Sequence, residues 1–103
     1  MSVFRVFYRK EPTFMLDKNL KKEQVLGQKT HCFVGSLPAA DMEVVFHDMQ
    51  GDFMARQNLK QVADARAKCG IMLHTSMSVG DCVQNMATKK VYQCANAGYQ
   101  EVR

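Results

Sequence analysis

The fold is predicted most clearly by residues 79–95, which read VGDCVQNMATKKVYQCA. Two apolar runs rich in strand-forming residues, 79–86 and 91–95, flank a short polar connection, and this pattern is typical of a β-hairpin. A three-residue connection would place Cys82 opposite Cys94 on the neighbouring strand. We therefore expect a C-terminal hairpin, led in by a loop rich in hydroxyl groups.

Two further strands are predicted in the first third of the chain. Residues 3–9 alternate in the manner of a strand, with a buried side that runs from Phe4 to Tyr8 at every second position. Residues 30–34 form a second short apolar run, which Gly35 is expected to end. Together with the hairpin, these runs predict four strands.

Three helices are predicted between the strands. Asp17 is placed to cap a short helix that runs to Leu26, and Gly27 is placed to end it in the left-handed conformation. Pro38 fits the first turn of a second helix, which Gly51 ends. A third helical pattern covers residues 57–69, with Gly70 as its stop.

Apolar spacing assigns the buried faces of the second and third helices. The inward positions of the second helix are Met42, Val45, Phe46 and Met49. The inward positions of the third helix are Leu59, Val62, Ala63 and Ala67. The polar face of the second helix carries Asp41, Glu43, His47 and Asp48, which we interpret as solvated.

This order of elements predicts an α+β fold. We expect a small two-layer domain in which a mainly antiparallel sheet ends in the hairpin and is covered by two or three helices. A chain of 103 residues that is 47% hydrophobic and 23% charged fits one domain, residues 1–103. The N-terminus lacks the apolar core of a signal peptide, and no apolar run approaches the ~20 residues of a membrane span, so we expect a cytoplasmic protein.

The cysteine pattern predicts free thiols and no metal site. The four cysteines contain no C-x-x-C spacing, and the only close pair of His and Cys residues is His31-Cys32, whose side chains would point to opposite faces of a strand. A cytoplasmic location keeps cysteines reduced. No cofactor motif occurs, and no spacing places a cysteine beside an activating histidine.

The basic charge is concentrated at the front of the chain. The formal net charge is +4, and residues 1–30 carry seven Lys and Arg against three Asp and Glu. Such an excess can attract nucleic acid. The residues that this alternative would use are Arg5, Arg9, Lys10, Lys18, Lys21 and Lys22. No aromatic residue is interleaved with the three central lysines, which favours a solvated surface.

The loop at 74–81 holds the residue types of a hydrolase triad in an arrangement that does not suit catalysis. A triad needs groups that converge from separate elements around a nucleophile on a sharp turn, and this loop lacks the G-x-S-x-G elbow. We expect its hydroxyl groups to satisfy backbone groups and predict no catalytic residue. The candidate binding residues are His74, Thr75, Ser76, Ser78 and Asp81.

The same loop carries a family resemblance. Residues 74–83 (HTSMSVGDCV), followed by residues 92–94 (YQC) and 98–99 (GY), resemble the marked segment of the YodL-like family, small domains of bacteria and of their phages and plasmids. Cys82 replaces the usual aliphatic residue, and Gln93 separates Tyr92 from Cys94. Residues 12–20 are similar to an upstream element of that family.

The resemblance implies an accessory role without an established catalytic residue. Members of the family often travel on mobile elements, which implies action on a host component. We therefore predict a non-enzymatic phage- or plasmid-type accessory protein that binds a host macromolecule, with a host protein as the first choice. Two alternatives stay open: a nucleic-acid-binding protein that uses the basic first third, and a small hydrolase-like enzyme that uses the loop at 74–81.

Overall fold

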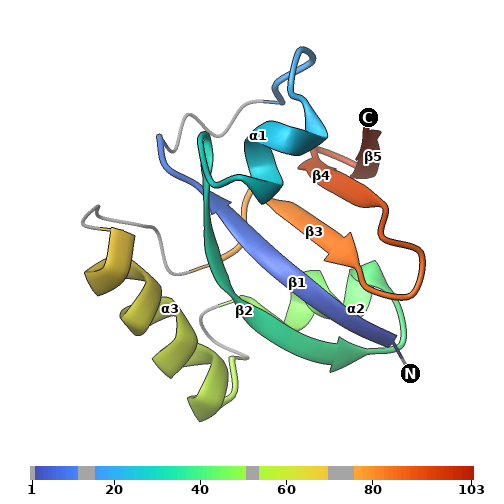
Figure 1. Ribbon diagram of the computed structural model, residues 1–103. Helices are drawn as coiled ribbons and strands as arrows, with labels where there is room; N and C mark the ends of the chain where they lie inside the picture. The colour runs from blue at the N-terminus through green and yellow to red at the C-terminus, as the bar shows by residue number, and fades with distance from the viewer. Residues whose placement is uncertain (1, 12–15, 51–53, 70–75) are drawn as a thin grey trace.

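The computed structural model describes residues 2–11, 16–50, 54–69 and 76–103, and within them it shows a five-stranded sheet and three helices (Figure 1). The strands are β1 (Ser2–Arg9), β2 (His31–Ala39), β3 (Cys82–Asn85), β4 (Val91–Ala95) and β5 (Gly98–Val102). The helices are α1 (Lys22–Leu26), α2 (Met42–Asp48) and α3 (Arg56–Cys69). All strand pairs are antiparallel, in the order β2-β1-β3-β4-β5. The predicted α+β fold is confirmed, and β5 is a strand that the sequence did not predict.

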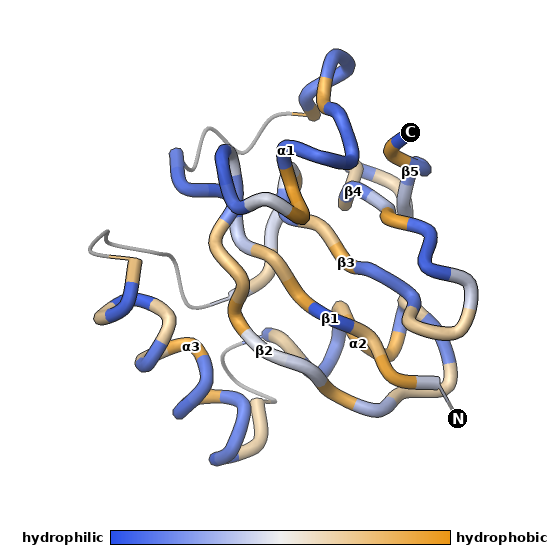
Figure 2. Tube along the Cα trace, in the orientation of Figure 1, coloured by the Kyte–Doolittle hydropathy of each residue, from blue (hydrophilic) through white to orange (hydrophobic). Residues whose placement is uncertain are grey.

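The helices are divided between the two faces of the sheet. Figure 1 shows α1 in front of the sheet and α2 behind it. The larger core cluster includes Phe4 and Val6 of β1 together with Val45 of α2, whereas a smaller cluster joins Phe7 of β1 to Val25 of α1. Because β1 is covered on both faces, large apolar residues occur on both of its sides. Figure 2 accordingly shows hydrophobic residues along most of this strand.

The predicted hairpin exists, but its register differs by one residue. Cys82 lies opposite Gln93, not opposite Cys94. The connection between the strands has four residues, 86–89, because Asn85 pairs with Lys90 and the left-handed φ of 65° at Lys89 turns the chain. The loop has one residue more than the predicted connection, so Cys94 lies on the face of the sheet opposite to that of Cys82.

The second strand is longer than predicted. β2 continues through Gly35, which does not end it, and through Pro38, which pairs with Val3 instead of starting a helix. Proline is tolerated here because β2 is an outer strand of the sheet and needs no N–H on its free side. Gly35 leaves room for the side chain of Gln61, which packs over it from α3.

The first helix is shorter than predicted, and its ends differ. It begins after Lys21, whose N–H donates to Gln24 Oε1 at 2.9 Å, and Asp17 instead accepts the N–H of Asn19 at 3.0 Å in a turn. Gly27 has φ of −81°, so it does not end the helix in the left-handed conformation. Gln28 takes that role, with φ of 57°.

The buried faces of α2 and α3 were only partly predicted. Val45 and Met49 are buried as expected, but Phe46 is 36% exposed. In α3, Val62 is buried as expected, while Leu59, Ala63 and Ala67 are exposed. The buried positions of α3 are Asn58, Val62 and Ala65. Asp41, assigned to the solvated face, is the N-cap of α2 and accepts the N–H of Val44 at 3.0 Å.

The prediction that all cysteines are reduced is wrong for one pair. Cys32 of β2 and Cys69 of α3 form a disulfide, with Cα atoms 6.5 Å apart. Spacing along the chain could not reveal this pair because its members lie 37 positions apart in the sequence. Cys82 and Cys94 are free and buried. Across the described ranges, the helices are too short and too polar to cross a membrane.

Candidate functional site

The loop before β3 is held from within by Asp81. Its carboxylate is fully buried, with Oδ1 accepting the N–H of Arg9 at 2.8 Å and Oδ2 accepting the N–H of Ser78 at 2.8 Å. Gly80 has a φ of 97°, which residues with a side chain rarely adopt, and its N–H donates to the carbonyl of Cys94 at 3.0 Å. A buried carboxylate is tolerated only when its oxygens are paired. Asp81 therefore fixes the loop against β1.

The same loop is joined to the end of α2. The N–H of Met77 donates to the carbonyl of Met49 at 3.0 Å, and Gln50 Nε2 donates to the carbonyl of Met77 at 3.0 Å. At the start of α2, the hydroxyl of Tyr99 donates to the carbonyl of Met42 at 3.1 Å. These bonds connect α2 to the loop at one end and to β5 at the other, so the three segments hold a fixed arrangement.

A groove lies between α2, the loop at 76–79 and the turn that joins β4 to β5. It consists of two adjoining hollows of about 220 and 400 Å³. Both hollows are lined by Phe46, Cys94, Ala95 and Asn96. The smaller hollow extends to Glu43 and Tyr99, and the larger one extends to Met77, Ser78 and Val79. We refer to the two hollows together as the α2 groove.

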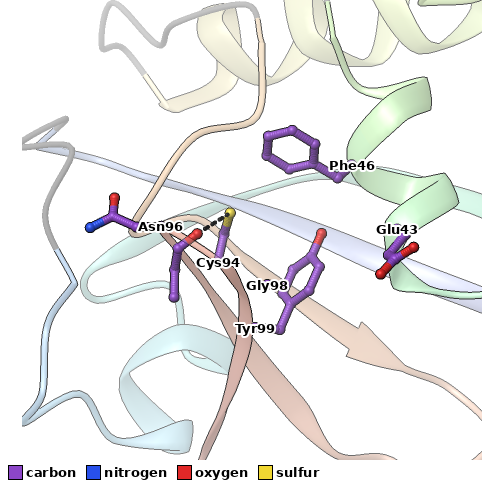
Figure 3. Close-up of a pocket in the computed structure, with 7 residues that line it drawn as sticks. Glu43, Phe46, Cys94, Asn96, Gly98 and Tyr99 are labelled. Atoms are coloured by element: carbon purple, nitrogen blue, oxygen red, sulfur yellow. Dashed lines mark hydrogen bonds between the residues drawn. The ribbon is translucent and has the colours of Figure 1, made fainter.

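Phe46 is the exposed apolar side chain of the α2 groove. Figure 3 shows its ring projecting from α2. The Cys94 thiol and the Tyr99 hydroxyl point toward the same side of the hollow. The residue is 36% exposed, and Val44 of the same helix is 37% exposed. Aromatic side chains beside a well-formed hollow are typical anchor points of protein–protein contacts.

The chemistry of the α2 groove suits recognition rather than covalent catalysis. Burial, reinforced by the nearby Asp81, raises the pKa of the Cys94 thiol to about 11, and burial likewise raises the pKa of Tyr99. Both groups are therefore neutral near pH 7, and a protonated thiol is a weak nucleophile. Glu43 is the charged residue that lines the described part of the groove.

A cysteine and a histidine do meet elsewhere in the fold. The register of the sheet brings Cys82 Sγ to 3.5 Å from His31 Nε2, a proximity that spacing did not predict. Nε2 lies 2.7 Å from the carbonyl of Gly80, which can only accept, so Nε2 carries the proton. Burial lowers the pKa of His31 and raises that of Cys82, and neither side chain is accessible. The pair is a neutral part of the core.

The predicted binding residues differ in where they lie, and Ser76 is half-buried without lining either hollow of the α2 groove. Ser78 lines the α2 groove, and its hydroxyl donates to the carbonyl of Ser76 at 3.4 Å, as expected for a hydroxyl that serves the backbone. Asp81 is fully buried, so it positions the loop and cannot contact a partner. His74 and Thr75 lie outside the described residues. The hydrolase-like alternative therefore stays a prediction.

The basic residues of the nucleic-acid alternative are interspersed with acidic ones. Arg9 Nη1 lies 3.6 Å from Asp17 Oδ2, and Lys18 and Lys21 line a hollow that Asp17 and Glu101 also line. Lys10 borders a different hollow together with Glu11.

Arg5 lies elsewhere, on the sheet, where its guanidinium carbon is 4.6 and 5.2 Å from the ring centroids of Phe33 and Phe7. Lys22 is the partly buried first residue of α1. Lys10 and the pair Lys18 and Lys21 thus line different hollows.

Sequence reasoning missed the α2 groove because it assigned Phe46 to the core. The available signal was the cap at Asp41: a helix that starts there has seven residues and presents a narrow apolar face. No family model matches this chain, and neither the curated proteins nor the solved structures contain a significant match to it.

Proposed function

We propose that this protein is a non-enzymatic binding domain that recognises a segment of a partner protein in the α2 groove. The observation that carries the proposal is the exposed Phe46 ring, which borders both hollows of a groove whose walls are joined by hydrogen bonds. Pre-organised walls favour binding because little conformational entropy is lost when the partner arrives. Neutral thiol and phenol groups provide no activated nucleophile.

The resemblance to the YodL-like family adds a biological setting to this proposal. The segment that carries the resemblance includes Met77, Ser78 and Val79, and these residues line one wall of the α2 groove. We accordingly propose a phage- or plasmid-type accessory protein whose partner is a host protein. The signature would then serve two purposes, with Asp81 holding the wall and residues 77–79 forming it.

Quantitative affinity capture with groove and control variants tests the proposal. Phe46→Ala removes the exposed ring of the groove, and Leu59→Ala removes an exposed side chain of similar size from α3, where Leu59 is 42% exposed. Tagged wild type and both variants are incubated with host lysate, with and without nuclease treatment. We expect wild type and Leu59→Ala to retain the same protein, and Phe46→Ala to retain at least tenfold less of it, about 1.4 kcal/mol of binding.

Two outcomes would contradict the proposal. Equal capture by the three proteins would mean that the groove does not carry the interaction. Capture that is lost on nuclease treatment, and that is restored by added nucleic acid, would favour the nucleic-acid alternative and the basic residues of the first third.

A further inference from the structure

The outer side of β5 is a free edge among the described residues. The strand order ends at β5, which β4 pairs on its inner side from Gly98 to Val102. The opposite edge of the sheet is blocked, because Gln61 of α3 hydrogen-bonds to both the N–H and the carbonyl of Ser36 in β2. An edge strand with unpaired backbone groups is a template for a further strand.

A hollow lies at each face of this edge. On the side of α2, Tyr99 borders the smaller hollow of the α2 groove. On the side of α1, Gln100 and Val102 border a hollow of about 250 Å³. Successive side chains of a strand point to opposite faces of the sheet, so a strand added to β5 would direct alternate side chains toward the two hollows.

The two hollows differ in charge. Glu43 lines the hollow on the side of α2. Lys18 and Lys21 line the hollow on the side of α1, where the carboxylate of Asp17 is paired with Arg9. Glu101 also borders that second hollow.

By strand alternation, Glu101 projects from the same face of β5 as Tyr99, toward α2. Opposite charges on opposite faces favour a partner segment whose side chains alternate in charge.

We propose that the partner segment binds in extended form as a sixth strand of the sheet, paired with β5. Apolar and basic side chains of the segment face α2, and its acidic side chains, at every second position, face Lys18 and Lys21. This inference rests on the proposed function, because one side of the added strand occupies the α2 groove. The backbone supplies affinity and the alternating side chains supply selectivity.

Selection from a displayed library of random nine-residue peptides tests the binding mode. The immobilised full chain is the target, and enriched peptides are synthesised with and without N-methyl groups on alternate backbone amides, in both phases. N-methylation removes a hydrogen-bond donor without changing a side chain. We expect enriched peptides to carry acidic residues at alternate positions, and one phase of N-methylation to weaken binding at least tenfold while the other phase has a smaller effect. Lys18→Glu with Lys21→Glu should weaken binding at least fivefold.

The outcomes separate this inference from the proposed function. Peptides that require Phe46 but tolerate both phases of N-methylation would overturn strand addition and leave the groove proposal standing. Peptides sensitive to one phase of N-methylation but indifferent to Phe46→Ala would support strand addition and contradict the groove proposal. Failure to enrich any peptide would overturn the inference, because nothing would then occupy the edge. Light scattering that shows a dimer through β5 would also overturn it, because a second copy of the chain would occupy the edge.

Discussion

Asp81 shows how much one buried carboxylate can organise. Its two oxygens accept the N–H groups of Arg9 in β1 and of Ser78 in the loop, and Arg9 lies 72 positions before Asp81 in the sequence. The sequence analysis gave Asp81 as a candidate binding residue, whereas the structure places its carboxylate in the interior, where it accepts two backbone N–H groups. The sequence could not predict the bond to Arg9, because only the pairing of β1 with β3 brings that N–H into range.

Replacing Asp81 should cost far more than replacing an exposed aspartate. Asp81→Ala leaves the N–H groups of Arg9 and Ser78 without an acceptor, and we expect the free energy of unfolding to fall by about 2–5 kcal/mol. Asp48→Ala removes a surface pair with His47 and should cost less than about 1 kcal/mol. Urea unfolding of both variants measures the difference. Similar small losses would show that the carboxylate does not hold the loop.

Because His31 is buried, we expect the protein to lose stability in mild acid. Burial lowers its pKa in the folded state, so the unfolded chain takes up a proton near pH 6.5 before the folded protein does. The contribution of neutral His31 to the free energy of unfolding is fully present above pH 6.5. It declines as the pH falls, by up to about 1.4 kcal/mol per pH unit. Urea unfolding at pH 7.5 and 5.5 measures it. His31→Gln should show a smaller difference between the two pH values, and an unchanged difference would refute this role.

At the scale of elements, α2 divides its apolar residues between the core and the groove. Val45 and Met49 are one turn apart and point into the larger core cluster, whereas Phe46 lies on the border of that face. A helix of seven residues can bury only a narrow stripe against a sheet. The neighbouring turn between β4 and β5 leaves the groove open, which keeps the Phe46 ring exposed.

Truncation of two α2 residues should separate these roles. Met49 is 2% exposed, and Met49→Ala should lower the free energy of unfolding by about 2–5 kcal/mol because it leaves a cavity. Phe46→Ala should lower it by less than about 1 kcal/mol, since the ring already contacts solvent. Thermal and urea unfolding of both variants provide the measurement. A loss above about 3 kcal/mol for Phe46→Ala would show that Phe46 is a core residue.

The sequence predicted elements better than it predicted their faces and partners. Alternation correctly identified β1, and helical spacing identified α2 and α3, because those patterns are local. The face of α3 was misjudged since the polar Asn58 is buried, where it accepts a hydrogen bond from Gln61. β5 was missed because an outer strand with polar residues has no apolar alternation. The α2 groove depends on three segments meeting, which no local pattern reports.

At the scale of the whole molecule, the two edges of the sheet are different. The β2 edge is joined to α3 by Gln61 and by the disulfide between Cys32 and Cys69, while the β5 edge is open among the described residues. The closed edge fixes the fold, and the open edge adjoins both proposed binding hollows. We propose that the β2 edge of the sheet contributes mainly to stability and that the β5 edge contributes to recognition.

The disulfide should contribute measurably to stability. It closes a loop of 37 residues, so Cys32→Ala with Cys69→Ala should lower the free energy of unfolding by up to about 4 kcal/mol, by the loss of a restraint on the unfolded chain. Urea unfolding with and without a reducing agent measures this. The double variant should not respond to the reducing agent, because Cys82 and Cys94 are already free thiols. A wild-type protein equally indifferent to reduction would contradict the cross-link.

The claim that a partner protein occupies the α2 groove is tested most directly by site-specific photocross-linking. A benzophenone side chain is placed at Asn96, an exposed residue of the groove, and in a separate protein at Ala63, an exposed residue of α3. Both proteins are irradiated in host lysate, and the adducts are identified by mass spectrometry. We predict one partner protein cross-linked at position 96 and absent from position 63. The same adducts from both positions, or an adduct at position 63 alone, would contradict the account.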